Sequence, residues 1–283
     1  MIVDAHQHFW NLETGDYPWL TPDLGVLYRT YGPEHLAPEL AATGVQATVL
    51  VQAADSGAET DALLALADAC AFVAGVVGWV PLTDPAEAAK ALERYASHPK
   101  FVGVRHLIHD EPDPDWLVRD GVLESLGLLA AQGLAFDVVS LLPRHLEHVV
   151  TLARRHPELK IVVDHLSKPR IKAGEWQPWA GRLAAAAAFP NVFAKVSGLV
   201  TEADHAAWTV ADLRPYVAHA VEVFGPERLM FGSDWPVALL AADYRTVFET
   251  ARALVGEQGS DLVFGGTAAR FYGFSGFSGG NAP

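Results

Sequence analysis

Residues 2–10 read IVDAHQHFW, an apolar strand that carries histidines at positions 6 and 8. Side chains alternate between the two faces of a strand, so His6 and His8 point to the same side and can share an ion or a substrate oxygen. Two other segments place polar residues at the ends of apolar runs. They are DHLSKP at 164–169, which contains His165, and FGSDWP at 231–236, which contains Asp234. This combination of residues indicates a hydrolase.

The run at 2–9 is the first of eight short apolar runs, many of them rich in valine. The others are 47–53, 73–81, 101–108, 135–140, 160–166, 192–197 and 229–235. Helical patterns lie between them at 60–70, 84–97, 116–132, 143–156, 175–189, 206–224 and 243–255. Parallel strands covered by crossover helices have this pattern. The sequence therefore predicts an α/β fold, a (β/α)8 barrel of the TIM type, with an extended loop at 11–33 after the first strand.

The length and the absence of a linker favour a single domain. A barrel of this type commonly takes about 250 residues, and the chain has 283. We expect the barrel to span residues 1–273. The last segment, 274–283, is rich in glycine and serine and is expected to form a flexible tail.

The charge and the apolar pattern exclude several classes of partner. The chain has 34 acidic and 20 basic residues, a net charge of -14, so binding to a nucleic acid backbone is not expected. The most apolar run, 69–80, is shorter than the ~20 residues that a membrane-spanning helix needs. The single cysteine, Cys70, cannot form an internal disulfide, and the N-terminus shows no secretory signal. These features predict a cytoplasmic protein.

The barrel topology brings the four polar residues together. Parallel strands deliver their carboxyl ends to one mouth, where barrel active sites lie. His6 and His8 end the first predicted strand, His165 ends the sixth and Asp234 ends the eighth. We therefore expect these four side chains to converge and to form the catalytic site.

These residues and their neighbours resemble the amidohydrolase superfamily, and within it the sugar-acid lactonases related to 2-pyrone-4,6-dicarboxylate lactonase. The resemblance spans nearly the whole chain. It is carried by DAHQHFW at 4–10, YPWL at 17–20, GVRHL at 103–107, DHLSKP at 164–169, KVSGL at 195–199 and FGSDWP at 231–236. It implies a reaction centre formed by His6, His8, His165 and Asp234.

The fifth predicted strand departs from the wider superfamily. Where that superfamily commonly carries a metal-binding histidine or carbamylated lysine, this strand reads AFDVVS. A binuclear site is therefore not expected. One divalent cation would be held by His6, His8 and Asp234, with His165 as a further candidate, and Zn2+ best suits imidazole and carboxylate ligands. A metal-independent reaction stays open as an alternative.

Other polar and aromatic residues near strand ends are candidates for substrate binding. Arg105 would bind a carbonyl, carboxylate or hydroxyl group, and a structural salt bridge is the alternative. Polar residues in otherwise apolar strands suit sugar hydroxyls or form hydrogen bonds within the core, and aromatic faces suit sugar rings or are simply buried. These candidates are Gln52, Asp137, Lys195, Trp10 and Trp235. His106 and His109 flank the end of the fourth strand, and either can face the pocket.

The resemblance thus implies hydrolysis of a sugar-acid lactone, such as L-fucono- or L-rhamnonolactone, and we expect Asp234 to act as the general base for a water molecule. The expected partner is this small molecule, with no nucleic acid and no membrane, and a homo-oligomer is compatible with the sequence. Two alternatives remain. One is a metal-dependent decarboxylase of the same superfamily, and the other is a sugar-binding barrel without catalysis.

Overall fold

Within residues 1–274, which the computed structural model describes, eight parallel strands form one sheet in sequential order. They are β1 (Val3–Gln7), β2 (Ala47–Val51), β3 (Val73–Gly78), β4 (Phe101–His106), β5 (Ala135–Val138), β6 (Lys160–Val163), β7 (Val192–Val196) and β8 (Leu229–Phe231). A parallel bridge between Gln7 and Trp235 joins the end of β1 to the segment after β8. The predicted (β/α)8 barrel is confirmed.

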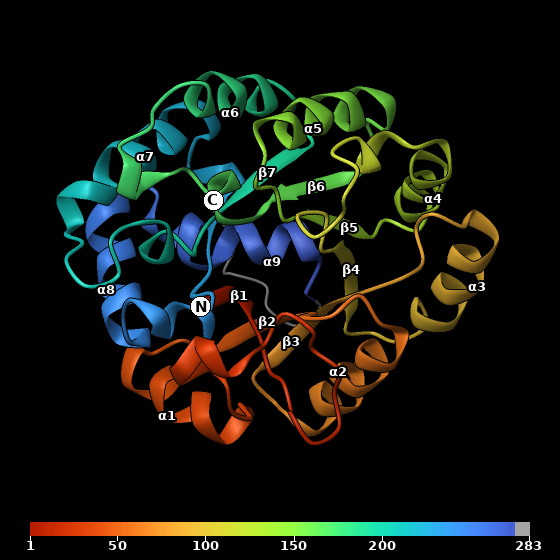
Figure 1. The fold of residues 1–283 in the computed structure, drawn as a ribbon, viewed down its shortest axis with the longest axis horizontal. Coiled ribbons are helices and arrows are strands. Elements are labelled where there is room, and N and C mark those ends of the chain that lie inside the picture. The colour runs from red at the N-terminus through yellow and green to blue at the C-terminus, as the bar shows by residue number, and fades with distance from the viewer. Residues whose placement is uncertain (275–283) are drawn as a thin grey trace, which may run out of the picture.

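One helix follows each strand, and together these helices surround the sheet (Figure 1). They are α1 (Pro33–Thr43), α2 (Gly57–Ala69), α3 (Pro85–Tyr95), α4 (Asp120–Ala131), α5 (Pro143–Arg155), α6 (Trp179–Ala187), α7 (Val210–Phe224) and α8 (Tyr244–Val255). Ser56 and Asp84 cap the starts of α2 and α3 by accepting hydrogen bonds from backbone N–H groups. The sequence pattern did not predict α1.

Two apolar layers hold the barrel together. The larger layer fills the space between the strands and the surrounding helices. The smaller one lies inside the barrel, where it includes Val49, Val77 and Met230. An additional helix, α9 (Thr267–Tyr272), crosses the end of the barrel near the N-terminus in Figure 1 and adds Phe271 and Tyr272 to this inner layer. The barrel is thus closed at the end opposite to the predicted site.

The predicted strands were too long at their carboxyl ends. β6 ends at Val163 and β8 ends at Phe231, so His165 and Asp234 lie in the turns that follow these strands. Both residues have positive φ angles, 53° and 57°, which a strand does not allow. Apolar runs alone do not show where the backbone leaves the strand conformation, and this explains the error.

The segment after β1 is the predicted extended loop. It leads through a short 3-10 helix, η1 (Pro22–Leu27), to α1. Most of the predicted tail, 275–283, lies outside the described residues. Within residues 1–274, no helix combines the length and the apolar character that crossing a lipid bilayer requires.

Asp4 connects the first strand to the segment after the last one. Its Oδ1 accepts hydrogen bonds from the backbone N–H groups of Ser233, at 2.8 Å, and of His6, at 3.1 Å. Its Oδ2 accepts a bond from the hydroxyl of Tyr244 in α8 at 3.1 Å. Asp4 is fully buried. Its carboxylate therefore fixes the junction at which the barrel closes.

Replacing Asp4 by alanine is expected to lower the free energy of unfolding by about 2–4 kcal/mol, because buried donors lose their acceptor. Guanidinium chloride unfolding of Asp4→Ala measures this loss. The control is Asp16→Ala in the exposed loop, which should change stability by less than about 0.5 kcal/mol. Equal stability of the two variants would contradict this role.

Candidate active site

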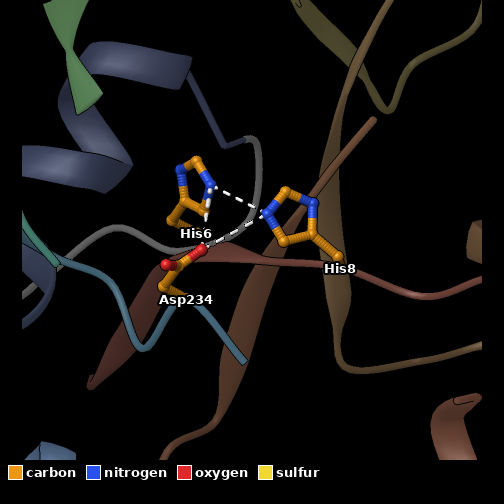
Figure 2. A group of neighbouring side chains, drawn as sticks. All are labelled: His6, His8 and Asp234. Carbon is orange, nitrogen blue, oxygen red and sulfur yellow. Dashed lines mark hydrogen bonds and ion pairs between the residues drawn. The ribbon is translucent and has the colours of Figure 1, made fainter. Parts of the chain in front are cut away.

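The four predicted residues meet at the carboxyl end of the barrel. The Oδ1 atom of Asp234 lies 3.4 Å from His8 Nε2, 3.8 Å from His6 Nε2 and 3.9 Å from His165 Nε2. The Nε2 atoms of His6 and His8 are 3.1 Å apart. Figure 2 shows His6 and His8 pointing toward the carboxylate of Asp234. All four side chains are buried.

A left-handed turn places His165. Residues 165–168 have φ angles of 53°, 49°, 62° and 47°, and the backbone N–H of Lys168 donates to the carbonyl of His165 at 2.9 Å. Non-glycine residues pay roughly 1–2 kcal/mol each for this conformation. Two contacts stabilise it. Trp179 donates its indole N–H to the carbonyl of Leu166 at 2.7 Å, and Ser140 bonds to Ser167 at 2.6 Å.

Gly198, directly after β7, leaves room for two of the site residues. Its φ is +61°, and a Cβ atom there would lie 2.7 Å from His165 Nδ1 and 2.9 Å from Asp234 Oδ2. Both distances are shorter than a carbon atom tolerates. A side chain at this position would therefore displace His165 or Asp234.

The partners of His8 determine its tautomer. His8 Nδ1 lies 2.8 Å from the carbonyl oxygen of Val51, and a carbonyl only accepts, so Nδ1 carries the proton. His8 Nε2 then presents a lone pair toward the carboxylate of Asp234. Two lone pairs at this distance need a proton or a cation between them. One metal ion would meet this requirement. A proton on His6 Nε2 can be donated to the lone pair of His8 Nε2, 3.1 Å away, but it does not lie between His8 and Asp234.

The pKa values describe the charge of the site. Burial lowers the pKa of His6 and of His8, and it lowers that of His165 to about 4. Burial alone would raise the pKa of Asp234, but the surrounding imidazoles hold it below its usual value. A proton that enters this cluster is therefore shared by ring nitrogens, and Asp234 stays ionised. At neutral pH the site contains neutral imidazoles around one carboxylate.

The same donor set fits one divalent cation. In a tetrahedral zinc site with bonds of about 2.0–2.2 Å, neighbouring ligand atoms lie about 3.3–3.6 Å apart. The three distances among His6 Nε2, His8 Nε2 and Asp234 Oδ1 are 3.1, 3.4 and 3.8 Å. These residues form one of the groups in the described chain that can hold a metal ion. The Nε2 atom of His165 lies farther from Asp234 Oδ1, at 3.9 Å, and His165 is a further candidate ligand.

A cavity of about 220 Å³ opens beside the carboxylate. It is lined by residues from several loops and strand ends: His8, Trp19, Ala53, Arg105, Leu107, His109, Val139, His165, Lys168, Asp234 and Val237. Cavities for drug-sized ligands usually measure about 300–1,000 Å³, so this one suits a single small ring. The Trp19 indole donates to the carbonyl of Ala53 at 2.7 Å, so the loop after β1 forms part of the wall.

Arg105 lines the cavity, and Gln52 stands behind it. The guanidinium of Arg105 donates to the side-chain oxygen of Gln52 at 3.1 and 3.2 Å and also to its backbone carbonyl. Gln52 is fully buried and donates to Asp55 at 2.8 Å. The structure thus brings Arg105, but not Gln52, to the wall of the cavity.

Lys195 and Asp137 lie beneath the site. Both are fully buried, and Lys195 Nζ lies 2.5 Å from Asp137 Oδ2 and 3.0 Å from Asp164 Oδ1. The same ammonium is 3.0 Å from His6 Nδ1. The structure therefore does not place Lys195 and Asp137 on the cavity wall. They pair with each other because their strands turn them toward the centre of the barrel.

The two tryptophans also lie away from the cavity. Trp10 lines a separate cavity of about 410 Å³ between the loop after β1 and α2, and its indole donates to the carbonyl of Arg29. Trp235 is buried against Phe9 and Tyr31. Neither indole is among the residues that line the cavity beside Asp234.

Sequence reasoning missed three residues of the site. Asp164 lies 3.3 Å from His6 Nδ1, and the DHLSKP segment contained this signal because Asp164 directly precedes His165. Trp19 and Lys168 line the cavity, but loop conformation decides both placements. The sequence left open whether His106 or His109 faces the pocket. His109 lines the cavity, whereas His106 stacks on Trp116 with ring centroids 4.0 Å apart.

The chain is similar to a known protein family, to two lactonases and to a solved structure. The amidohydrolase family model matches residues 3–274. The L-fucono-1,5-lactonase of Burkholderia ambifaria is 41% identical over 278 residues, which cover 95% of this chain and 94% of that protein. The L-fucono-1,5-lactonase of Burkholderia multivorans is 38% identical and 95% of each chain is covered. A crystal structure of an amidohydrolase from Burkholderia multivorans with bound zinc has 37% identity and a TM-score of 0.88, with 97% and 99% of the two chains covered.

Alanine at position 198 is expected to destabilise the protein by more than backbone strain alone. Gly133 has a similar φ of +68° with no atom within 4 Å of an added Cβ, so Gly133→Ala reports the strain cost of roughly 1 kcal/mol. Gly198→Ala should lose a further 1–3 kcal/mol, approximately, because it crowds two buried side chains. Chemical denaturation of the two variants measures the difference. Equal losses would show that residue 198 does not crowd the site.

Proposed function

Since this chain belongs to the amidohydrolase family, we propose that it hydrolyses the lactone of a sugar acid, with L-fucono-1,5-lactone as the leading candidate substrate. The observation that carries the proposal is an ionised, buried carboxylate, Asp234, which faces a cavity of single-ring size. The similarity to two lactonases over nearly the whole chain supports it.

The charges of the cavity favour a neutral substrate. Among the described residues that line it, the two permanent cations are Arg105 and Lys168. Arg105 pairs with Asp164 at 3.4 Å, and Lys168 pairs with Glu202 at 3.0 Å. A dicarboxylate would find no unpaired cation on this wall. A lactone with hydroxyl groups needs hydrogen bonds only, and the wall offers them.

In the proposed reaction, Asp234 accepts a proton from water while the water oxygen bonds to the lactone carbonyl carbon. The bond between this carbon and the ring oxygen then breaks. The ring oxygen takes the proton from Asp234 and leaves as a hydroxyl group, so the product is an open-chain hydroxy acid. His6, His8 and His165 surround the carboxylate and orient it, and the positive charge of Arg105 on the cavity wall favours the negative charge that develops on the carbonyl oxygen.

His6, His8 and Asp234 are the residues that would hold a divalent cation, and Zn2+ is the ion we propose. When bound, it would supply Lewis acidity to the carbonyl. The pairing of His8 Nδ1 with Val51 leaves His8 Nε2 free as a ligand. His6 Nδ1 accepts from the ammonium of Lys195 at 3.0 Å, so Nε2 carries the ring proton in this arrangement. Ligation through Nε2 would require that proton to move to Nδ1, where Asp164 would accept it at 3.3 Å while the ammonium kept its pairs with Asp137 and Asp164.

The alternatives have less support in the structure. The decarboxylase hypothesis relied on a metal-binding histidine at the fifth strand, and here Asp137 of β5 is committed to Lys195 and Tyr272. A binding protein without catalysis does not need an ionised carboxylate among three imidazoles. We place the reaction in the cytoplasm, an assignment supported by the free, buried Cys70.

Asp234→Asn should lower kcat for a sugar-acid 1,5-lactone by about 10²–10⁴-fold, because the amide cannot accept the proton from water. A pH indicator follows acid release. The matched control is Asp68→Asn, which should keep wild-type rates because Asp68 is exposed and pairs with His98 at the surface. Near wild-type turnover by Asp234→Asn would remove Asp234 from the mechanism. Release of no acid by the wild type from a panel of sugar lactones would reject the lactonase function.

Zinc binding should need both imidazole and carboxylate ligands. Isothermal titration of the chelator-treated protein with Zn2+ should show one site, and His8→Ala or Asp234→Asn should weaken it at least about 10-fold. His98→Ala, which removes a histidine from the surface, should bind as the wild type does. Equal zinc affinity in all these proteins would place the ion elsewhere. Rates measured with and without chelator then separate metal binding from a metal requirement.

A further inference from the structure

Lys168 lines the cavity but has no part in the chemistry described above. It is the last residue of the left-handed turn at 165–168, with a φ of 47°. Its ammonium lies 3.0 Å from Glu202 Oε1, and the two side chains are 23% and 18% exposed. Lys168 is therefore a half-buried cation with a fixed partner at the edge of the cavity.

A simple surface ion pair does not explain this lysine. The left-handed conformation costs a lysine more than it would cost a glycine, and a single ion pair that solvent still reaches, with side chains 23% and 18% exposed, contributes little to stability. The ion pair with Glu202 alone therefore does not offset the free-energy cost of the left-handed conformation. Strained residues concentrate where side chains contact ligands, and the side chain of Lys168 lines a cavity.

The hydrogen-bonding capacity of Lys168 also differs from that of Arg105. The guanidinium of Arg105 is occupied by Gln52 and Asp164. An ammonium group has three N–H donors, and Glu202 is the partner found for one of them. Lys168 thus retains donors for a ligand in the cavity.

The remainder of the wall orients the ligand. Leu107, Val139 and Val237 provide an apolar surface, whereas His8, His165 and Asp234 gather the reacting groups. A lactone whose carbonyl lies at Asp234 has its ring substituents elsewhere in the cavity. Among the described lining residues, Lys168 is the cation with free donors that can meet such a substituent.

We propose that Lys168 is a substrate-binding residue that donates hydrogen bonds to a ring hydroxyl of the lactone and so selects hydroxylated lactones over unsubstituted ones. This inference rests on the proposed lactonase function. Glu202 is a positioning residue that holds the ammonium at the cavity edge. Arg105 and Asp234 act on the carbonyl end, and Lys168 recognises the hydroxylated part of the ring.

The test compares two substrates that differ in their hydroxyl groups, L-fucono-1,5-lactone and the unsubstituted six-membered δ-valerolactone. For Lys168→Met, KM for the sugar lactone should rise about 10–100-fold with kcat within about threefold, the effect expected when a charged hydrogen bond is lost. KM for δ-valerolactone should stay within about twofold of the wild type. Lys168→Arg, which keeps a cation, should recover most of the affinity for the sugar lactone.

Lys172→Met is the matched control, because Lys172 pairs with Asp204 at 3.1 Å and does not line this cavity. It should leave both KM values unchanged. Glu202→Gln should raise KM for the sugar lactone less than Lys168→Met does. An unchanged KM for the sugar lactone in Lys168→Met, or equal losses on both lactones, would overturn the proposal. If the wild type hydrolyses neither lactone, the lactonase function fails and the inference falls with it. If the wild type hydrolyses the sugar lactone, the lactonase function stands and the variants test the role of Lys168 alone.

Discussion

The site depends on a lysine ammonium that is buried between two carboxylates at the centre of the barrel. Lys195 Nζ lies 2.5 Å from Asp137 and 3.0 Å from Asp164, and Arg105 reaches Asp164 from the other side at 3.4 Å. Two cations and two carboxylates thus balance where water does not reach. Loss of one partner from such a pair costs roughly 3–5 kcal/mol. The charge beneath His6 is therefore fixed before any substrate enters the cavity.

Backbone strain is concentrated above this buried charge. In the described part of the chain, the non-glycine residues with positive φ are His165, Leu166, Ser167, Lys168 and Asp234. All belong to the two turns that follow β6 and β8. The rigid strands, helices and buried hydrogen bonds around them stabilise these turns. Strain of this kind persists only where the surrounding structure over-determines it, and here it holds a carboxylate against three imidazoles.

The sequence was sufficient for the barrel and for the four central residues because both follow from periodicity. Alternating apolar runs predict strands, and parallel strands bring their carboxyl ends together. The partners of the Lys195 and Gln52 side chains could not be predicted in this way. The sequence pattern shows a polar residue in a strand, but not whether its side chain faces a ligand or a buried partner. Trp10 and Trp19 belong to one loop, and only its path decides which indole reaches the cavity. The prediction was thus accurate for the order of the strands, but it missed α1 and the points where strands end, and it did not identify the partners of polar side chains such as Lys195.

The hydrogen bond from Tyr272 of α9 to Asp137, at 2.9 Å, links the barrel floor to a segment that follows all eight strands in the sequence. Asp234 is likewise synthesised roughly 230 residues after the two imidazoles of β1. At about 5–20 residues per second, this delay lasts about 10–50 s. During that delay the end of β1 lacks the segment after β8 to which it is bridged, and His6 and His8 lack the carboxylate of Asp234. The four side chains therefore assemble only after β8 has been synthesised, so a polypeptide that ends before Asp234 would contain no complete site.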